Sequence, residues 1–143
     1  MTEALERALE LIRRFEGCRL TAYRCPAGVW TIGWGETLGV KEGDVWTQEQ
    51  ADAVLRRRVA QFMLATLKRC PALHADPERL AACVSLAYNI GVGAFGASSV
   101  CRKTLRREYA SAADSFLLWN KAAARVLRGL TLRRQAERRV YMG

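Results

Sequence analysis

The spacing of apolar residues changes near the start of this chain, and that change constrains the fold more than any other feature. Apolar residues recur at helical spacing up to Gly17, a natural helix stop. Two runs rich in Thr, Tyr, Trp, Val and Ile follow at 20–24 and 29–34, with the turn signal Cys25-Pro26-Ala27-Gly28 between them. Helical spacing returns after Thr47. The sequence therefore predicts a mostly helical α+β fold whose strands are confined to one early hairpin.

Helix boundaries are predicted from apolar spacing and capping residues. A first helix is expected over 3–16 and a long one over 47–69, which opens with the capping-box pattern of Thr47-Gln48-Glu49-Gln50. Pro77 suits the first turn of a helix that runs to about Ile90. Further helices are expected at 95–107, 110–119, 121–128 and 131–141, separated by Gly93, by the Tyr109 region and by Gly129.

The length of 143 residues allows one domain with a substantial core. We expect a single domain over 1–143, in which 17–46 form a small hairpin lobe. Residues 1–16 and 47–143 then form a helical lobe together with the connecting helix. Half of the residues are hydrophobic, which argues against a disordered chain.

Two features of the sequence bear on its location in the cell. No stretch approaches the roughly 18 apolar residues that a membrane span requires. Residues 1–7 are acidic and amphipathic and lack the basic and apolar regions of a signal peptide. The sequence therefore predicts a protein made in the cytoplasm, with neither a signal peptide nor a transmembrane segment.

The formal net charge of +9 is unevenly distributed along the chain. Residues 102–143 contain 11 Lys or Arg and 3 Asp or Glu, a net charge of about +8. A cationic C-terminal part favours an anionic partner such as a nucleic acid, a membrane surface or the bacterial envelope. The alternative is a set of solvated helix faces.

The five cysteines, Cys18, Cys25, Cys70, Cys83 and Cys101, include no CxxC pair. An odd number without such a pair argues against a zinc site and against a complete disulfide framework. One bridge among Cys70, Cys83 and Cys101 could form in an oxidising compartment, and the sequence does not choose between the pairs.

Polar residues around the predicted hairpin suit glycoside hydrolysis, which needs a proton donor and a means of bringing in water. Glu16, at the end of the first helix, is the candidate donor, and an ordinary surface glutamate is the alternative reading. Thr31 alternates with its strand neighbours, so its hydroxyl could hold a water if that face fronts a cleft. Cys25 stands where a second carboxylate would be expected. It could act as a thiolate base or nucleophile if Arg24 or another cation lowers its pKa from about 8.5, or it could be an inert thiol.

Three ordered blocks, covering essentially the full length, resemble the phage-type lysozymes, the endolysins that cleave bacterial peptidoglycan. In that family a catalytic Glu is followed after eight residues by Asp or Cys and after five more by Thr, a spacing that this chain shares. The blocks are Glu16-Gly17 … Tyr23-Arg24-Cys25 … Thr31-Ile32-Gly33-Trp34-Gly35-x-Thr37, then Tyr88-Asn89-Ile90-Gly91-Val92-Gly93-Ala94-Phe95 with Ser98-Ser99, and Gly129-Leu130-Thr131-Leu132-Arg133-Arg134-Gln135-Ala136-Glu137.

The resemblance implies a lysozyme-like fold and hydrolysis of the β-1,4 bond between N-acetylmuramic acid and N-acetylglucosamine, leading to lysis of the host cell. Glu16 would be the general acid, Cys25 would occupy the position that is Asp in many relatives, and Thr31 would position the attacking water. The family needs no metal or organic cofactor, and none is expected here.

The later blocks imply residues that bind the sugar chain or support the site. The expected substrate contacts are Tyr88, Asn89, Gly91, Gly93 and Ser98. Arg133 or Arg134 is expected to pair with Glu16 or to brace the site. For Asn89 the alternative is a cap at a helix end.

One departure from the family concerns Glu36. The run Gly33-Trp34-Gly35-Glu36-Thr37 stands where many relatives have GYGHT, so Glu36 replaces a histidine. Glu36 could lose an ion pair of the family, or it could supply the missing second carboxylate.

The expected partner is peptidoglycan, bound by a monomer that does not bind nucleic acid. The basic C-terminal part could also contact anionic envelope polymers or the outer membrane. Access to the wall from the cytoplasm would need a separate protein that permeabilises the membrane. Two other functions stay open: a lytic transglycosylase that uses Glu16 alone and leaves an anhydro product, and a non-catalytic basic domain that binds the wall or nucleic acid.

Overall fold

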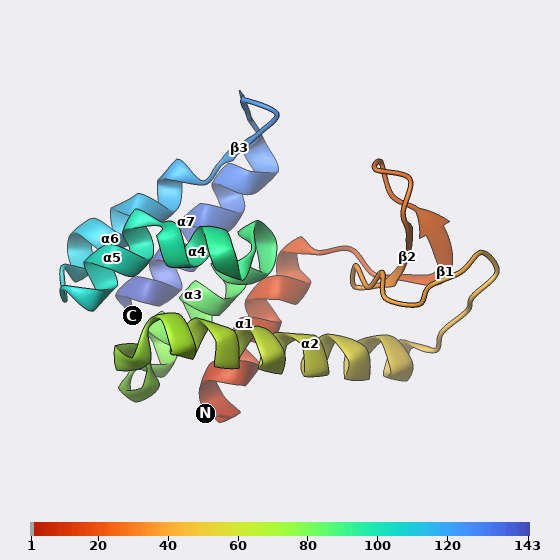
Figure 1. Cartoon of the computed structure of the whole chain (residues 1–143), viewed down its shortest axis with the longest axis horizontal. Coiled ribbons are helices and arrows are strands. Elements are labelled where there is room, and N and C mark those ends of the chain that lie inside the picture. Colours follow the sequence, from red (N-terminus) through yellow and green to blue (C-terminus); the bar gives the residue numbers. More distant parts are fainter. Residues whose placement is uncertain (1) are drawn as a thin grey trace.

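A small hairpin lobe and a larger helical lobe are joined by one long helix in the computed structural model, which describes residues 2–143 (Figure 1). Helix α1 (Thr2–Phe15) precedes strands β1 (Arg19–Arg24) and β2 (Trp30–Gly33), and α2 (Gln48–Arg69) returns to the helical lobe. The other elements are η1 (Pro71–Ala75), α3 (Pro77–Ile90), α4 (Val92–Ala97), α5 (Ser99–Leu105), α6 (Tyr109–Ser115), η2 (Phe116–Leu118), β3 (Lys121–Ala122), β4 (Arg125–Val126) and α7 (Arg128–Met142). The predicted fold class, mostly helical α+β, is confirmed.

Strands β1 and β2 form the predicted antiparallel hairpin, with Tyr23 opposite Thr31 and Arg24 opposite Trp30. In the turn, the Cys25 backbone N–H donates to the Val29 carbonyl and the Gly28 N–H donates to the Cys25 carbonyl. Gly28 adopts the left-handed backbone that the turn requires, with φ of 80°. Gly33 is also left-handed, and a Cβ at this position would lie 2.9 Å from the Trp46 ring. These contacts fix the strand ends beside the start of α2.

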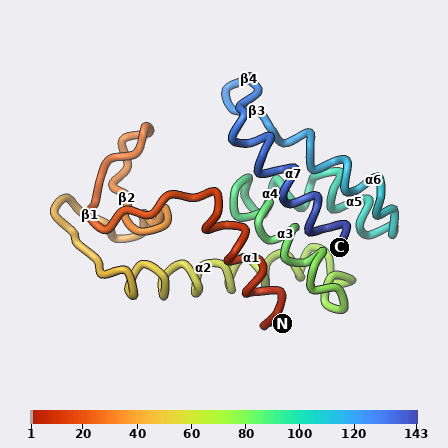
Figure 2. Tube along the Cα trace, turned by 180° about the vertical axis from the view of Figure 1, so that it is seen from behind, coloured from red at the N-terminus to blue at the C-terminus, as the bar shows by residue number. Residues whose placement is uncertain are grey.

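Helix α2 begins with the predicted capping box. Thr47 accepts a hydrogen bond from the Gln50 backbone, and the Gln50 side chain accepts one from the Thr47 backbone. The helix is 22 residues long, which at about 1.5 Å per residue makes it roughly 33 Å from end to end. Both views show it running from the hairpin lobe along the edge of the helical lobe (Figures 1 and 2). It therefore connects the lobes as expected.

Helix α3 is the centre of the core. Pro77 occupies its first turn, as predicted, and residues 80–87 are all buried. Small residues such as Ala81, Ala82 and Ala87 let α1, α2 and α7 approach closely, and each of them packs against α3. The last residues of α3 emerge from this core at the cleft described below.

The predicted helix over 95–107 is wrong as one element, because the chain forms α4 and α5 with a break at Ser98. The Ser98 hydroxyl accepts from the Cys101 backbone, so Ser98 starts a new helix. Gly93 lies inside α4 and does not separate helices. The predicted helix over 110–119 ends at Ser115 and continues as the 3-10 turn η2.

The predicted helix over 121–128 is also wrong, so strands are not confined to the early hairpin. Strands β3 and β4 pair there, and Ala123 and Ala124 form the turn with φ of 51° and 63°. The alanines favour a helix locally, but all six residues of the hairpin are exposed, so no packing supports one. The backbone bond from Leu127 to Asn120 closes its base. Gly129 accordingly lies within α7, which starts at Arg128 and not at 131.

The hairpin β3–β4 projects from the helical lobe in both views, and the C-terminus also lies on that lobe (Figures 1 and 2). Within residues 2–143, no helix combines the length and the apolar character that a membrane span requires.

Candidate active site

Glu16 lies just beyond the last turn of α1, where its backbone N–H donates to the Ile12 carbonyl at 2.8 Å. Its side chain is 28% exposed, and Oε1 accepts a hydrogen bond from Arg133 Nη1 at 2.7 Å. The Arg133 side chain is only 3% exposed, so this ion pair joins a partly open carboxylate to a buried cation. The sequence predicted such a pair for one of two adjacent arginines, and Arg133 makes it.

A cleft of about 400 Å³ opens beside Glu16, between the hairpin lobe and the helical lobe. Residues from the loop after β2, from α2 and from the end of α3 surround it. They are Glu16, Trp34, Gly35, Glu36, Thr37, Arg58, Phe62, Tyr88 and Asn89. The cleft therefore combines two partly exposed acids, Glu16 and Glu36, with aromatic and polar walls, which suits a carbohydrate ligand.

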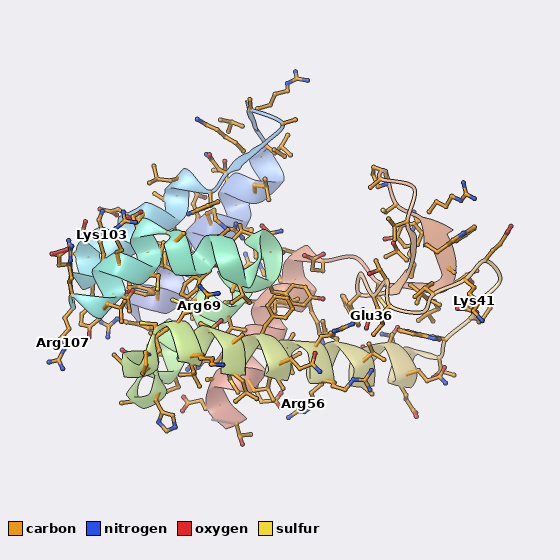
Figure 3. All side chains as sticks on the ribbon, in the orientation of Figure 1. Glu36, Lys41, Arg56, Arg69, Lys103 and Arg107 are labelled. Carbon is orange, nitrogen blue, oxygen red and sulfur yellow. The ribbon has the colours of Figure 1, made fainter. Side chains whose placement is uncertain are left out.

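Glu36 lies where the hairpin lobe meets α2 (Figure 3). Arg58 binds both of its oxygens, with Nε 2.9 Å from Oε1 and Nη2 3.2 Å from Oε2. The same carboxylate accepts from the Thr37 backbone at 3.1 Å. A bidentate ion pair of this kind is among the stronger charged contacts. It raises the pKa of Arg58 above its ordinary value and holds Glu36 against α2.

The wall opposite Glu16 is held to α2 by a second contact. Trp34 Nε1 donates to Asp52 Oδ1 at 2.8 Å, and the Gln48 side chain donates to the same oxygen at 2.9 Å. These two donors lower the pKa of Asp52. Tyr88 reaches across from α3 and donates to the Trp34 carbonyl at 3.3 Å.

Trp34, Arg58 and Phe62 line the cleft, although the sequence pattern did not predict them as site residues. Arg58 and Phe62 lie four residues apart on α2, so they share one face of the helix. Phe62 lies among the regularly spaced apolar residues of α2, and it contacts the Tyr88 ring edge-on, with centroids 5.1 Å apart. An arginine interleaved with the apolar stripe was the only available signal.

Cys25 and Thr31 lie together on the hairpin. The backbone N–H groups of Val29 and Ala27 face the Cys25 thiol and, with a smaller contribution from the Thr31 hydroxyl, lower its pKa. Arg24, which the sequence suggested as a cation that could lower the pKa of Cys25, does not contribute to that shift. Its guanidinium stacks on the Trp30 ring instead, 5.1 Å from the centroid.

Thr31 is 4% exposed, and its hydroxyl donates to the Val29 carbonyl at 2.9 Å. Neither Cys25 nor Thr31 lines the cleft beside Glu16. Among residues 2–143, no hydrogen bond or ion pair joins Glu16 to either of them. The structure thus brings the thiol and the hydroxyl together and leaves the acid in a separate cluster.

Asn89 lies in the cleft wall at the end of α3. Arg134 Nη1 donates to its Oδ1 at 2.9 Å, so Asn89 is held by α7 and is not a helix cap. Its amide N–H groups stay available to a ligand. Gly91, with φ of 96°, ends α3, and Gly93 is exposed on α4; neither lines the cleft.

Ser98 takes a structural position. It is 4% exposed, and its hydroxyl both accepts from the Cys101 backbone and donates to the Phe95 carbonyl at 2.6 Å. All five cysteines are free thiols, and Cys70, Cys83 and Cys101 are buried in the helical lobe.

A second depression, of about 390 Å³, continues on the other side of Glu16. It shares Glu16 and Asn89 with the cleft, and Phe15, Leu127, Gly129, Leu130 and Arg133 complete its lining. Glu16 therefore stands between two linked hollows, an arrangement that can hold a polymer on both sides of the acid.

Comparison with known proteins places this arrangement in context. A sequence model of the family described as Phage lysozyme matches residues 13–137. The endolysin of Acyrthosiphon pisum secondary endosymbiont phage 1 is 41% identical over 142 residues, which is 95% of each chain. The endolysin of Bacillus phage B103 is 33% identical over 137 residues, and the present chain spans only 52% of its length. Among solved structures, the muramidase domain of SpmX from Asticaccaulis excentricus superposes with a TM-score of 0.85 at 32% identity, covering 95% of both chains.

Proposed function

The chain belongs to the phage lysozyme family of muramidases, which degrade peptidoglycan, and from that premise we propose that it hydrolyses the β-1,4 bond between N-acetylmuramic acid and N-acetylglucosamine. The observation that carries the proposal is the position of Glu16 between two linked hollows, with one carboxylate oxygen held by Arg133. A glycan strand lying through both hollows would place one glycosidic oxygen next to this carboxyl group.

Glu16 acts in this proposal as the general acid that protonates the leaving oxygen. Its second oxygen, Oε2, is free of the Arg133 contact and can present the proton. The hollows provide sugar-binding surfaces on both sides, with Trp34 and Phe62 on one side and Leu127 and Leu130 on the other. Proton donation is thus confined to the bond that lies beside Glu16.

Thr31, together with Cys25, positions the attacking water. Their mutual contact and the lowered pKa of the thiol support this role, because a lowered pKa increases the fraction of Cys25 present as thiolate, the form that can accept a proton from water. Glu36 is less suited to be the second carboxylate, since both of its oxygens are engaged by Arg58. We therefore propose that Glu36 supports the cleft wall.

Asn89 and Tyr88 contact the sugar chain from the helical lobe, whereas Gly91 and Gly93 are left out of the proposed site because neither lines the cleft. The fixed Oδ1 of Asn89 supports this, because it leaves the amide N–H groups to donate to sugar oxygens. Arg134 acts by holding Asn89. Ser98 is left out of the proposed site because its hydroxyl caps α5 and bonds only to the Phe95 and Cys101 backbone, away from the other proposed site residues.

The decisive test is Glu16→Gln on purified peptidoglycan, with Glu10→Gln as the matched control. Glu10 lies exposed on the same helix, so its replacement tests charge loss without touching the cleft. We expect Glu16→Gln to abolish release of soluble fragments and Glu10→Gln to match wild type. Activity in Glu16→Gln would contradict the proposal.

Mass spectrometry of the released fragments separates hydrolysis from transglycosylation. Hydrolysis adds one water to each cleaved bond, whereas a transglycosylase leaves an anhydro sugar that is lighter by one water. Wild-type protein that binds the wall but releases no fragments would identify a binding domain instead.

We further propose that the basic C-terminal part concentrates a monomer on anionic wall or outer-membrane polymers. The protein is made in the cytoplasm and reaches the periplasm after another protein permeabilises the membrane. Exposed cations on the projecting hairpin support this contact with anionic polymers. Lys121 and Arg125, for example, form no ion pair within residues 2–143. Raising the salt concentration should weaken binding to purified envelopes, and binding that is insensitive to salt would argue against it.

A further inference from the structure

Glu137 is a buried carboxylate that lies outside the groups proposed to donate the proton, position the water or bind the sugar. It lies on α7 one turn after Arg133, and its side chain is 0% exposed. Removing a carboxylate from water is unfavourable unless partners compensate its charge. Its partners are the two arginines that reach the cleft.

One oxygen of Glu137, Oε2, accepts hydrogen bonds, and the other, Oε1, makes an ion-pair contact without a hydrogen bond. Oε2 accepts from Ser85 Oγ at 2.5 Å, from Arg133 Nε at 3.2 Å and from Arg134 Nη2 at 3.1 Å. Oε1 lies 2.7 Å from Arg134 Nε. Burial raises the pKa of Glu137, and both arginines and Ser85 oppose that rise.

Each arginine contacts Glu137 through one part of its guanidinium and the cleft through another. Arg133 presents Nη1 to Glu16, and its Nη2 donates to the Ser85 carbonyl at 3.1 Å. Arg134 presents Nη1 to Asn89. One arginine therefore separates Glu137 from the Glu16 carboxylate, and the other separates it from the Asn89 amide.

We propose that Glu137 is a positioning residue, which aims Arg133 at Glu16 and Arg134 at Asn89 and balances the charge of the two arginines. This inference rests on the proposed function, in which Glu16 is the general acid. Two carboxylates and two guanidinium groups form the network, so its net charge is zero with all four ionised. Without the charge of Glu137, Glu16 would be the only anion in the network to balance the two arginines, and the net charge would be +1.

That imbalance has a definite effect on the pH dependence. Extra positive charge favours the ionised form of Glu16, which cannot donate a proton. A general acid loses activity as the pH rises and its proton is lost. The alkaline limb of the rate profile should therefore move to lower pH when Glu137 is neutralised.

The other charged or titratable groups around this network do not change in that experiment. They are Arg13 and Arg14 on α1, Cys83 and Tyr88 on α3, Arg58 on α2 and Glu36 in the loop after β2. Burial raises the pKa of Cys83 and raises that of Tyr88 to about 12, so both are neutral at pH 7. Arg58 and Glu36 compensate each other.

The test is the initial rate on purified peptidoglycan across pH for Glu137→Gln, which keeps the size of the side chain. We expect the alkaline limb to shift down by about one pH unit. The double variant Glu137→Gln/Arg134→Gln restores charge balance around Glu16, so its limb should return toward wild type, although its rate falls because Asn89 is released. A packing role alone would lower the rate of both variants without moving the limb, and that result would overturn the inference.

If Glu137→Gln fails to fold, Glu137→Asp provides the readout. The shorter carboxylate keeps the charge and cannot hold both arginines, so the rate should fall about tenfold with the limb unchanged. A wild-type rate would overturn the inference. The two proposals fail separately: an active Glu16→Gln variant refutes the acid, whereas an inactive Glu16→Gln with an unshifted Glu137→Gln refutes only the positioning role.

Discussion

The two reactive groups of the proposed site, Glu16 and Cys25, are held by contacts of different range. Arg133, which is 117 residues from Glu16 in the chain, holds the acid, and a buried ion-pair network on α3 and α7 supports that arginine. Cys25 is held within its own hairpin, by Val29, Ala27 and Thr31. The acid thus depends on the assembled core, whereas the thiol depends on one turn.

Because of this difference, substitutions around Glu16 and around Cys25 should affect stability and activity differently. A change near Glu16 disturbs buried charges in the core, so it should affect folding and catalysis together. A change near Cys25 disturbs an exposed turn, so it should affect catalysis alone. The following experiments test that contrast.

The largest effect is expected for Arg133→Met. This variant leaves Glu137 short of a partner and removes the Glu16 contact, so the free energy of unfolding should fall by about 3–5 kcal/mol. Urea denaturation measures the loss, with Arg139→Met as the control. Arg139 is exposed on the same helix and should change stability by less than about 0.5 kcal/mol. Equal stability of the two variants would show that the network does not support the core.

The next effect concerns Cys25→Ser and Cys25→Asp. Serine cannot carry the charge and should lower the hydrolysis rate by about 100-fold, whereas aspartate should stay within about tenfold of wild type. Neither should change the denaturation midpoint, because the turn is not part of the core. Full activity of both variants would make Cys25 a spectator.

The pH profile sharpens this test. If the Cys25 thiolate accepts the proton of the water, the rate rises with pH as the thiol ionises. Backbone N–H groups lower the pKa of Cys25, so the rise should lie below the range of an ordinary thiol. In Cys25→Asp the rise should move to much lower pH, as expected for a carboxylate. An identical acidic limb in wild type and Cys25→Asp would argue against the thiolate.

A smaller effect is expected where the hairpin lobe is fastened to α2. Arg58→Met removes the bidentate contact with Glu36 and should reduce the rate about tenfold by loosening the cleft wall. Stability should fall by about 1 kcal/mol, since the pair is partly exposed. Arg57→Met, exposed on the same helix, is the control. A double-mutant cycle with Glu36→Gln would give no coupling energy if the pair contributes nothing.

The smallest effect on stability is expected in the turn of the hairpin β3–β4, which lies outside the cleft. Ala123 and Ala124 adopt the left-handed backbone that glycine tolerates. Ala123→Gly and Ala124→Gly should each raise the free energy of unfolding by about 0.5–1 kcal/mol without changing the hydrolysis rate. Thermal unfolding provides the measurement. Destabilisation would show that these alanines have packing contacts that outweigh the backbone strain.

Much of the fold could be predicted because its signals are local. The capping box at Thr47 and the turn at residues 25–28 are each satisfied by neighbours within a few residues, and the first helix, predicted to stop at Gly17, ends at Phe15. The helix predicted over residues 121–128 was wrong because it, too, was inferred from a local signal. Three alanines favour a helix locally, and the closing bond between Leu127 and Asn120 overrides that preference.

The site was predictable to a lesser degree. Residue spacing and family resemblance identified Glu16, Asn89 and the two arginines, but they did not say which arginine meets which partner. The cleft walls at Trp34, Arg58 and Phe62 were missed because lining a cleft is a property of the assembled lobes. Ser98 was placed in the site on resemblance, and its burial gives it a capping position instead.

Residue identity and short-range spacing in the sequence were enough to predict the early hairpin, the long connecting helix, the family and the position of the acid at the end of a helix. Only the tertiary structure decided that Arg133 faces Glu16, that Arg134 faces Asn89 and that Glu137 joins them. The Arg133–Glu16 and Arg134–Asn89 contacts cross 117 and 45 residues of chain, whereas Glu137 lies only four and three residues from the two arginines on α7. The two long-range contacts form because packing α1, α3 and α7 excludes water and leaves each buried charge dependent on the others.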